Sequence, residues 1–301
     1  MLSILSLPDA PVAFDTVVAL GYFDGVHRGH MALLQETVRL ARALGARPAV
    51  FTFSDGFKDK APLTDQGERL RLFEAAGIEV VFLVDFAAIR SLSPEEFVKN
   101  CLQFLCRAKS AVCGFNFRFG KGAVGTAEDL LALFPEAAVV PAVYEGGEVI
   151  SSTRVRRLLG EGRVEDAALL LGRPYTVTGE VLHGKELGAI LGFPTANMKP
   201  KTLLPASAVY ATAVKIDGKY FPAITDVGTR PTVEGQGELR METHLPDFSG
   251  DLYGRSLSVA FLRRLREEKR FSSLEELKTQ LEQDAASLRT LYATSRKDFT
   301  L

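Results

Sequence analysis

Tryptophan is absent from this chain of 301 residues, cysteine and histidine are scarce, and neither sign of charge dominates. The three cysteines, Cys101, Cys106 and Cys113, are odd in number and lack CxxC spacing. We therefore expect buried free thiols in a reducing compartment rather than disulfides or a zinc site. The net charge is −1, with 36 Lys and Arg against 37 Asp and Glu. Because general binding to nucleic acids or membrane surfaces usually requires a basic excess, neither partner is expected.

Long uncharged apolar runs are absent as well. The segment Met1–Asp9 lacks the basic start and the extended apolar run of a signal peptide, and no uncharged run approaches the length of a membrane span. Hydrophobic residues nevertheless make up 47% of the chain, which excludes a disordered protein. We expect a cytoplasmic protein whose length allows two ordinary domains.

The first half of the chain alternates short apolar runs with amphipathic ones. Strands are predicted at 16–21, 48–53, 79–84, 110–114 and 137–140, and helices at 29–44, at 64–76 and from Ser93 onward. Wholly apolar strands alternating with helices are typical of a parallel, doubly wound sheet. We therefore predict an α/β domain over residues 1–172.

The periodicity changes after a helical stretch at 154–171, where Gly172-Arg173-Pro174 interrupts the pattern. Strands are predicted at 175–182, 209–216, 219–227, 240–245 and 256–262, followed by one helix that begins at Ser272 or Ser273. Asp217-Gly218 is a strong hairpin signal. Residues 173–301 are therefore expected to form a small antiparallel β-barrel with a terminal helix.

Ten residues from Gly21 to His30 mark the turn from the first predicted strand into the first predicted helix. The spacing of His27 and His30 places their side chains on one face of a helical turn. Gly25 permits close backbone approach, and the N–H groups of a helix start can face an anion. This arrangement favours a phosphate site. The alternatives are a helix-capping turn with two solvent-facing histidines, or a metal pair.

A second motif, Leu191–Asn197, lies in the other half of the chain. The Thr195 hydroxyl and the Asn197 amide oxygen are hard oxygen donors of the kind that Mg²⁺ bound to ATP accepts. A turn with a satisfied threonine and asparagine is the alternative. Two phosphate-handling motifs so far apart indicate two nucleotide-dependent steps.

The first motif resembles the HxGH signature of the nucleotidyltransferase superfamily, in its flavin-adenylating branch. The resemblance continues at 114–120 and at 150–156. It implies a Rossmann-like nucleotidyltransferase domain with FMN adenylyltransferase activity, in which the phosphate of FMN attacks ATP. The catalytic residues that it implies are His27, His30 and Arg156. The ligand-binding residues that it implies are Gly21, Phe23, Asp24, Gly25, Asn116, Ser151, Ser152 and Thr153.

The second motif resembles the Gly-rich entry and the Pro-Thr-Ala-Asn motif of riboflavin kinases. The match continues through 228–232, 242–244, 247–254, 265–268 and 271–273. It implies that Glu242 is the general base for a substrate hydroxyl and that Thr195 and Asn197 are metal ligands. The remaining ligand-binding residues that it implies are Gly184, Gly188, Pro194 and Arg266.

The two halves together are similar to the family of bacterial bifunctional riboflavin kinase/FAD synthetases. The resemblance implies Mg²⁺, ATP as co-substrate, and riboflavin, FMN and FAD as substrates and products. It implies nothing about the oligomeric state.

Two short segments and two single residues depart from the family pattern. Ser54-Asp55-Gly56 stands where a Pro-His-Pro segment is usual, and Ala123-Val124-Gly125-Thr126 replaces an Arg-x-Gly-Asp pattern. Ala189 replaces an arginine, and Asp226 replaces an asparagine. These departures leave two alternatives open: a riboflavin kinase with weakened or lost adenylyltransferase activity, and a non-enzymatic flavin-responsive binding protein.

Overall fold

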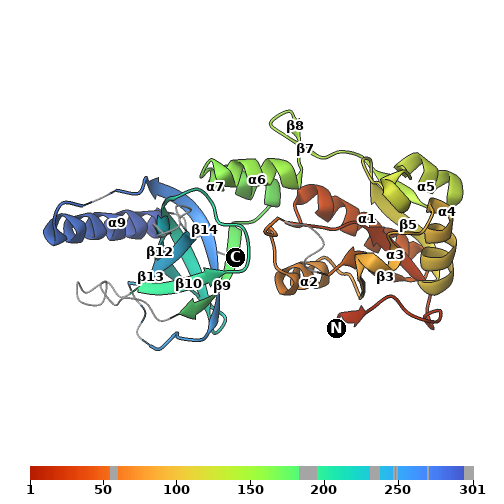
Figure 1. The fold of residues 1–301 in the computed structure, drawn as a ribbon, viewed down its shortest axis with the longest axis horizontal. Helices are drawn as coiled ribbons and strands as arrows, with labels where there is room; N and C mark the ends of the chain where they lie inside the picture. The colour runs from red at the N-terminus through yellow and green to blue at the C-terminus, as the bar shows by residue number, and fades with distance from the viewer. Residues whose placement is uncertain are drawn as a thin grey trace. The chain divides into compact units, whose positions relative to one another are not determined.

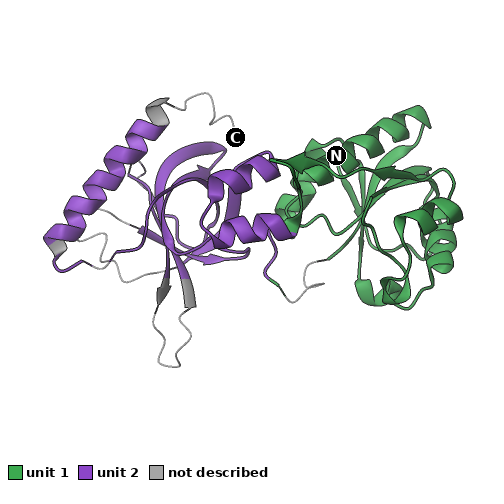
Figure 2. Ribbon diagram, turned by 90° about the horizontal axis from the view of Figure 1, so that it is seen from above, with its two compact units in different colours: residues 1–60, 64–152 green, residues 61–63, 153–301 purple. Residues whose placement is uncertain are grey.

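The computed structural model describes residues 1–54, 60–182, 195–230, 238–246, 248, 250–269 and 271–294. The chain divides into two compact units (Figure 2). Unit 1 comprises Met1–Lys60 and Thr64–Ser152, and unit 2 comprises Ala61–Leu63 and Thr153–Leu301. The helical stretch that we assigned to the first domain is thus grouped with unit 2, and the domain boundary at residue 172 stays a prediction.

Unit 1 is built on a six-stranded sheet in which every neighbouring pair is parallel. In the order β1-β4-β3-β2-β5-β6, the strands are β1 (Ser3–Leu5), β4 (Val80–Val84), β3 (Arg47–Phe53), β2 (Thr16–Leu20), β5 (Ala108–Gly114) and β6 (Ala138–Val140). The predicted parallel, doubly wound sheet is confirmed. The edge strand β1 was not predicted, because three residues are too few to show a period.

Helices cover both faces of this sheet (Figure 1). Alternate residues of β2 point to opposite sides: Val17 and Ala19 join one core, and Val18 and Leu20 join the other. The first core is completed by α1 (Arg28–Ala43) and α2 (Gln66–Ala75), and the second by the π-helix η1 (Phe97–Leu105) and α5 (Ala127–Leu133). Unit 1 also contains the short helical segments α3 (Phe86–Ile89), α4 (Pro94–Glu96) and η2 (Lys121–Ala123).

A short hairpin, β7 (Tyr144–Glu145) and β8 (Glu148–Val149), follows β6. Its Glu145 carboxylate pairs with the guanidinium of Arg28, the first residue of α1. The hairpin is thereby tied to the turn that carries the first motif.

The helical stretch at 154–171 is two helices, α6 (Ser152–Gly160) and α7 (Val164–Leu171). Gly162 lies between them with φ of +72°, and Gly172 ends α7 in the left-handed conformation. Because glycine adopts positive φ without steric cost, these two residues set the breaks.

Unit 2 contains a closed, six-stranded antiparallel barrel, as predicted (Figure 1). In barrel order, its strands are β10 (Thr195–Pro200), β13 (Glu238–His244), β12 (Lys219–Arg230), β11 (Ala208–Ile216), β14 (Ser256–Arg266) and β9 (Tyr175–Leu182). The sequence did not predict β10. The second motif therefore ends on a barrel strand rather than in a turn.

Alternation along the strands separates the inside of the barrel from its outer wall. Three threonines, Thr212, Thr225 and Thr243, are fully buried inside the barrel. Their hydroxyl groups form a chain of two hydrogen bonds, of 2.8 and 3.0 Å. Ile224, next to Thr225, faces outward and packs with Ala285 of the terminal helix α9 (Leu274–Thr294). Side chains that share a face with Ile224 thus belong to the outer wall that α9 covers.

No helix in the described part of the chain has both the length and the apolar character needed to traverse a lipid bilayer.

Candidate active sites

The first motif forms a constrained turn at the carboxyl end of β2. Phe23, Gly25 and Val26 have positive φ angles of 59°, 84° and 38°. Such angles are costly for Phe and Val and persist only where surrounding contacts enforce them. Phe23 and Val26 are both buried, and the Gly25 N–H donates to the hydroxyl of buried Thr64 at 3.1 Å. The conformation of the turn is therefore fixed by the burial of its two apolar side chains and by the hydrogen bond to Thr64.

His27 and His30 are brought together, as the sequence predicted. Their rings stack with centroids 3.6 Å apart, and Phe23 packs edge-on against His30 at 5.2 Å. His27 is the N-cap of α1, and its Nδ1 accepts from the His30 N–H at 3.2 Å. Since Nδ1 is an acceptor, a neutral His27 carries its proton on Nε2, where it can be donated. The capping alternative is thus correct for His27, but this side chain is buried rather than solvent-facing.

The start of α2 braces the same turn through a residue that the sequence analysis missed. Arg69 is 1% exposed, and it donates to the carbonyl oxygens of Tyr22 at 3.4 Å and Phe53 at 3.2 Å. Its guanidinium also lies 5.0 Å from the centroid of the Tyr22 ring. Arg69 therefore joins the carboxyl ends of two neighbouring parallel strands, β2 and β3.

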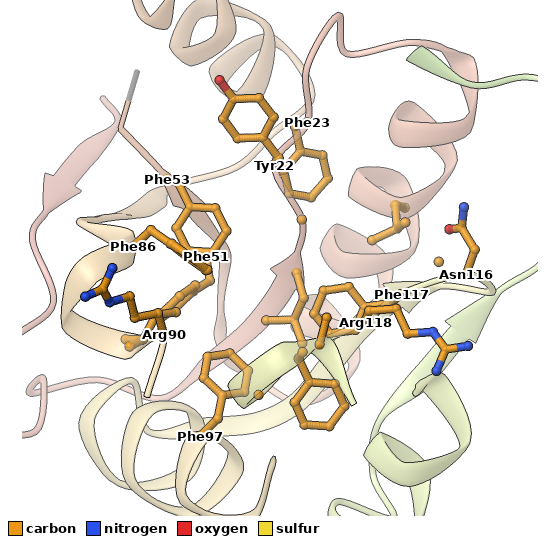
Figure 3. A pocket seen from close by; sticks show the side chains of 18 of the residues that line it. Tyr22, Phe23, Phe51, Phe53, Phe86, Arg90, Phe97, Asn116, Phe117 and Arg118 are labelled. Carbon is orange, nitrogen blue, oxygen red and sulfur yellow. The ribbon is translucent and has the colours of Figure 1, made fainter. Parts of the chain in front are cut away.

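A cavity of about 700 Å³ opens at these strand ends (Figure 3). Gly21, Phe23, His30 and Asn116, which the first motif and its continuation predicted, all line it. The rest of the described lining includes seven aromatic residues that were not predicted as site residues, although three of them lie within the first motif or its continuation: Tyr22, Phe51, Phe53, Phe86, Phe97, Phe117 and Phe119. Tyr22 and Phe53, at the carboxyl ends of parallel strands, are at the edge where α/β proteins bind ligands, and this position was the available signal.

The predicted second phosphate motif lies at the start of α6. The Ser152 hydroxyl donates to the carbonyl of Asp24 at 2.8 Å, so this serine is joined to the first motif. Asp24 itself is buried, and Ser151 immediately precedes the helix. Thr153 and Arg156 belong to unit 2, where Arg156 donates to the Ala61 carbonyl at 2.7 Å.

The departures in unit 1 have local structural roles where they are described. Thr126 is the N-cap of α5 and forms a capping box with Asp129, with contacts of 2.9 and 3.2 Å. The Ser54 N–H donates to the Val84 carbonyl at 3.3 Å, which extends the pairing of β3 with β4. Asp55 and Gly56 lie outside the described residues.

The barrel aligns three polar residues across neighbouring strands. Asn197 of β10 is paired with Glu242 of β13, and Glu242 is paired with Asp226 of β12. Directly opposed residues share a face, and Thr243, next to Glu242, points inward. The row therefore lies on the outer wall, where Thr195 and His244 form a second opposed pair.

A cavity of about 310 Å³ lies along this wall and reaches α9. It is lined by Thr195, Asp226, Glu242 and Arg266, and by Phe271, Leu277 and Leu281 on the apolar side. Thr195 also lines a second cavity of about 320 Å³, together with Phe248 and Tyr253. Thr195 of the second motif thus lines both cavities.

Charge is concentrated around Arg240, two residues before Glu242. Its guanidinium contacts the carboxylates of Glu242 at 2.9 Å, Asp226 at 3.6 Å and Glu268 at 3.9 Å. Burial raises the pKa of Asp226 to about 6; Glu268 and Glu242 push it in the same direction, and Arg240 and Arg266 oppose them. The departure at residue 226 therefore introduces a carboxyl group that is difficult to ionise next to Glu242.

Arg266 is held by the terminal helix. It donates to both carboxylate oxygens of Asp284, from Nη2 at 2.8 Å and from Nε at 3.1 Å. Asp284 is only 5% exposed, and Arg266 lies near the Phe271 ring. The predicted ligand-binding residue therefore lines the cavity and at the same time joins β14 to α9.

Part of the second motif cannot be compared with the structure. Gly184, Gly188, Ala189 and Pro194 lie outside the described residues. No group of three or more metal-ligating His, Cys, Asp or Glu occurs among the residues that are described.

The match to known families covers both halves of the chain. Residues 10–154 match the FAD synthetase family, and residues 171–292 match the riboflavin kinase family. A bifunctional riboflavin kinase/FMN adenylyltransferase of Pseudomonas fluorescens is 40% identical, with 93% of this chain and 94% of the relative covered. The enzymes of the same description from Escherichia coli K12 and Bacillus subtilis are 37% and 33% identical, with 93–94% of this chain and 94% of each relative covered.

A solved structure is also similar over nearly the full length. It is described as a macrolide-efflux protein from Streptococcus pneumoniae and is 33% identical, with a TM-score of 0.88 and coverage of 96% of this chain and 99% of that one. That description names a different activity from that of the sequence relatives, whereas both family matches and the two compact units agree with the relatives. The chain belongs to the bifunctional riboflavin kinase/FMN adenylyltransferase family.

Proposed function

We propose that this protein makes FAD from riboflavin in two ATP-dependent transfers: phosphorylation of riboflavin to FMN in unit 2, and adenylation of FMN in unit 1. The observation that carries the proposal is that each compact unit holds a cavity lined by residues of its own phosphate motif. We place the reactions in the cytoplasm, where ATP is available.

In the kinase step, Glu242 acts as the general base. Its carboxylate takes the proton of the ribityl 5′-hydroxyl, the hydroxyl oxygen attacks the γ-phosphorus of ATP, and ADP leaves. The cavity of 310 Å³ holds the flavin, whose ring packs against the apolar residues of α9 and Phe271. The cavity of 320 Å³ holds the nucleotide, and Phe248 and Tyr253 supply aromatic surface for the adenine.

Thr195 and Asn197 are the proposed ligands of Mg²⁺. Alternate residues of a strand project to the same side, so the Thr195 hydroxyl and the Asn197 amide lie on one face of β10. Two neutral oxygen donors fit a cation that reaches the protein mainly through ATP phosphates and waters. When bound, Mg²⁺ neutralises the phosphate charge.

In the adenylyl transfer, a phosphate oxygen of FMN attacks the α-phosphorus of ATP, and pyrophosphate leaves. His27 and His30 stabilise the charge that develops on the phosphorus oxygens, with the His27 Nε2–H as one donor. Asn116, Ser151 and Ser152 of unit 1 bind the ATP phosphates. The aromatic wall of the 700 Å³ cavity holds the isoalloxazine ring.

Incubation of the pure protein with riboflavin, ATP and Mg²⁺, followed by separation of FMN from FAD, tests the proposal. We expect FMN first and FAD later. FMN alone would indicate a kinase without adenylyltransferase activity, and neither product would indicate a binding protein. The family match over both halves supports the two-step enzyme over both alternatives.

A further inference from the structure

The 700 Å³ cavity is lined, among the described residues, by basic side chains without acidic ones. Its described lining includes Arg90, Arg118 and His30 but no aspartate or glutamate. No ion pair joins Arg90 to another residue in the described ranges of the chain. A cation that lines a cavity rich in aromatic side chains and has no carboxylate partner there is suited to a ligand with acceptor atoms or negative charge.

Arg90 lies on the opposite side of the cavity from Asn116 and Arg118 (Figure 3). It is the C-cap of α3, and it lies beside Phe53 and Phe86, whose rings pack edge to face at 5.2 Å. Two separate polar ends, with aromatic walls between them, therefore characterise this cavity.

The geometry of adenylyl transfer determines which of these ends receives the phosphate of FMN. The phosphate of FMN must reach the α-phosphorus of ATP beside the histidine pair, and in the proposed site Asn116, which lines the cavity, binds the ATP phosphates. The isoalloxazine ring then extends toward Arg90. One edge of this ring is a pyrimidine-dione with two carbonyl oxygens and a ring nitrogen as acceptors, while the opposite edge is an apolar dimethylbenzene.

We propose that Arg90 binds the pyrimidine-dione edge of the flavin and so fixes the orientation of FMN in the adenylyltransferase site. The inference rests on the proposed function of unit 1. A guanidinium presents several N–H donors in one plane, which matches adjacent acceptors along the edge of a flat ring. The surrounding phenylalanines offer that edge no other hydrogen bond, so Arg90 is a specificity-determining residue for the flavin.

Two fragments of FMN allow binding at the ring end and binding at the phosphate end of the site to be measured separately. Lumiflavin has the ring without the ribityl phosphate, and ribitol 5-phosphate has the tail without the ring. Both are used as inhibitors of FAD formation from FMN, a reaction that reports on unit 1 alone. The variants are Arg90→Met, which keeps the stem length but removes the donors, and Arg90→Lys, which keeps the charge. Arg71→Met, an exposed arginine of α2, is the matched control.

For Arg90→Met we expect the KM for FMN and the inhibition constant of lumiflavin to rise about tenfold, the effect of one lost charge-assisted hydrogen bond. The inhibition constant of ribitol 5-phosphate and the KM for ATP should not change. For Arg90→Lys, the KM for FMN and the inhibition constant of lumiflavin should lie between those of the wild type and of Arg90→Met. For Arg71→Met, both constants should match the wild type.

Unchanged lumiflavin inhibition in Arg90→Met would overturn the assignment. A weaker effect of ribitol 5-phosphate would overturn it as well, because Arg90 would then bind the phosphate tail. Absence of FAD formation from FMN by the wild-type protein would contradict the proposed function itself, and the inference with it.

Discussion

Asn197 and Glu242 lie directly opposite each other on the neighbouring antiparallel strands β10 and β13. Side chains in opposed positions are neighbours on one face of a sheet. The barrel thereby places the proposed metal-binding amide next to the proposed general base, although the two residues come from different motifs. Riboflavin phosphorylation needs this proximity, because the attacking hydroxyl and the γ-phosphate must meet.

Glu242→Gln should lower FMN formation by about 10²- to 10⁴-fold, because the amide keeps the shape of the side chain but does not take a proton. Nucleotide binding should remain nearly intact. Single-turnover FMN formation and ATP titration measure the two properties. Near-normal turnover would remove Glu242 from the mechanism, and FAD formation from FMN serves as the internal control.

Thr195→Ala and Asn197→Ala should raise the Mg²⁺ concentration needed for half-maximal FMN formation, because each change removes one oxygen donor. The measurement is a Mg²⁺ titration at saturating riboflavin. Lys199→Ala, an exposed residue farther along the same strand, is the control. A titration curve that does not move in either variant would count against the ligand assignment.

Asp226 should make unit 2 less stable as the pH rises. Its pKa is about 6 in the folded protein, above the ordinary value of 3.8, because burial disfavours the charged form. The folded state thus binds more protons than the unfolded state between these values, and stability falls as pH rises through this window. Above pH 6 the cost is about 1 to 2 kcal/mol, allowing for the 30% exposure of the side chain.

The variant Asp226→Asn removes this titration. Its free energy of unfolding should exceed that of the wild type at pH 8, and the difference should shrink as the pH falls toward 5. Chemical denaturation at several pH values measures it. A difference that is constant with pH would mean that residue 226 acts through packing alone.

The sequence predicted the elements with a clear period and missed those set by tertiary pairing. The apolar strands of the parallel sheet and the helix after Gly29 were predicted from local pattern. β10 was missed because Thr195–Pro200 lacks a run of β-branched or aromatic residues and acquires its strand geometry from pairing with β9 and β13.

The same distinction applies to the sites. The histidine pair could be predicted because both members lie within one helical turn. Asp226 could not be placed beside Glu242, since their proximity depends on the register between β12 and β13. Arg69 could not be recognised either, because its two acceptors, the Tyr22 and Phe53 carbonyls, come from separate strands.

Arg69→Met should destabilise unit 1 by about 1–3 kcal/mol, because it removes the buried guanidinium that donates to the Tyr22 and Phe53 carbonyls; the Tyr22 carbonyl keeps its bond from the Thr52 hydroxyl. FAD formation should fall, with a larger rise in the KM for FMN than for ATP, since both carbonyls belong to residues of the aromatic cavity. Denaturant unfolding and steady-state kinetics measure these effects, with exposed Arg71→Met as the control. Equal changes in both KM values would contradict a role specific to the flavin wall.

His30→Ala should reduce FAD formation from FMN by about 10²- to 10³-fold, the usual loss when one stabilising donor is removed. FMN formation from riboflavin should be spared, because Glu242 and its cavity belong to the other compact unit. Product analysis of each half-reaction measures the two rates. Full retention of FAD synthesis would show that the histidine pair is only structural.

The central claim is that two separate sites on one chain perform consecutive steps, and mixing two variants, each impaired in a different step, tests it most directly. His30→Ala alone should convert riboflavin to FMN and stop there, and Glu242→Gln alone should leave riboflavin unchanged while it still adenylates added FMN. An equimolar mixture of the two, supplied with riboflavin, ATP and Mg²⁺, should make FAD, because FMN released by the first variant is adenylated by the second. A mixture that makes no FAD, although each variant retains its own half-reaction, would contradict two independent sites linked by free FMN.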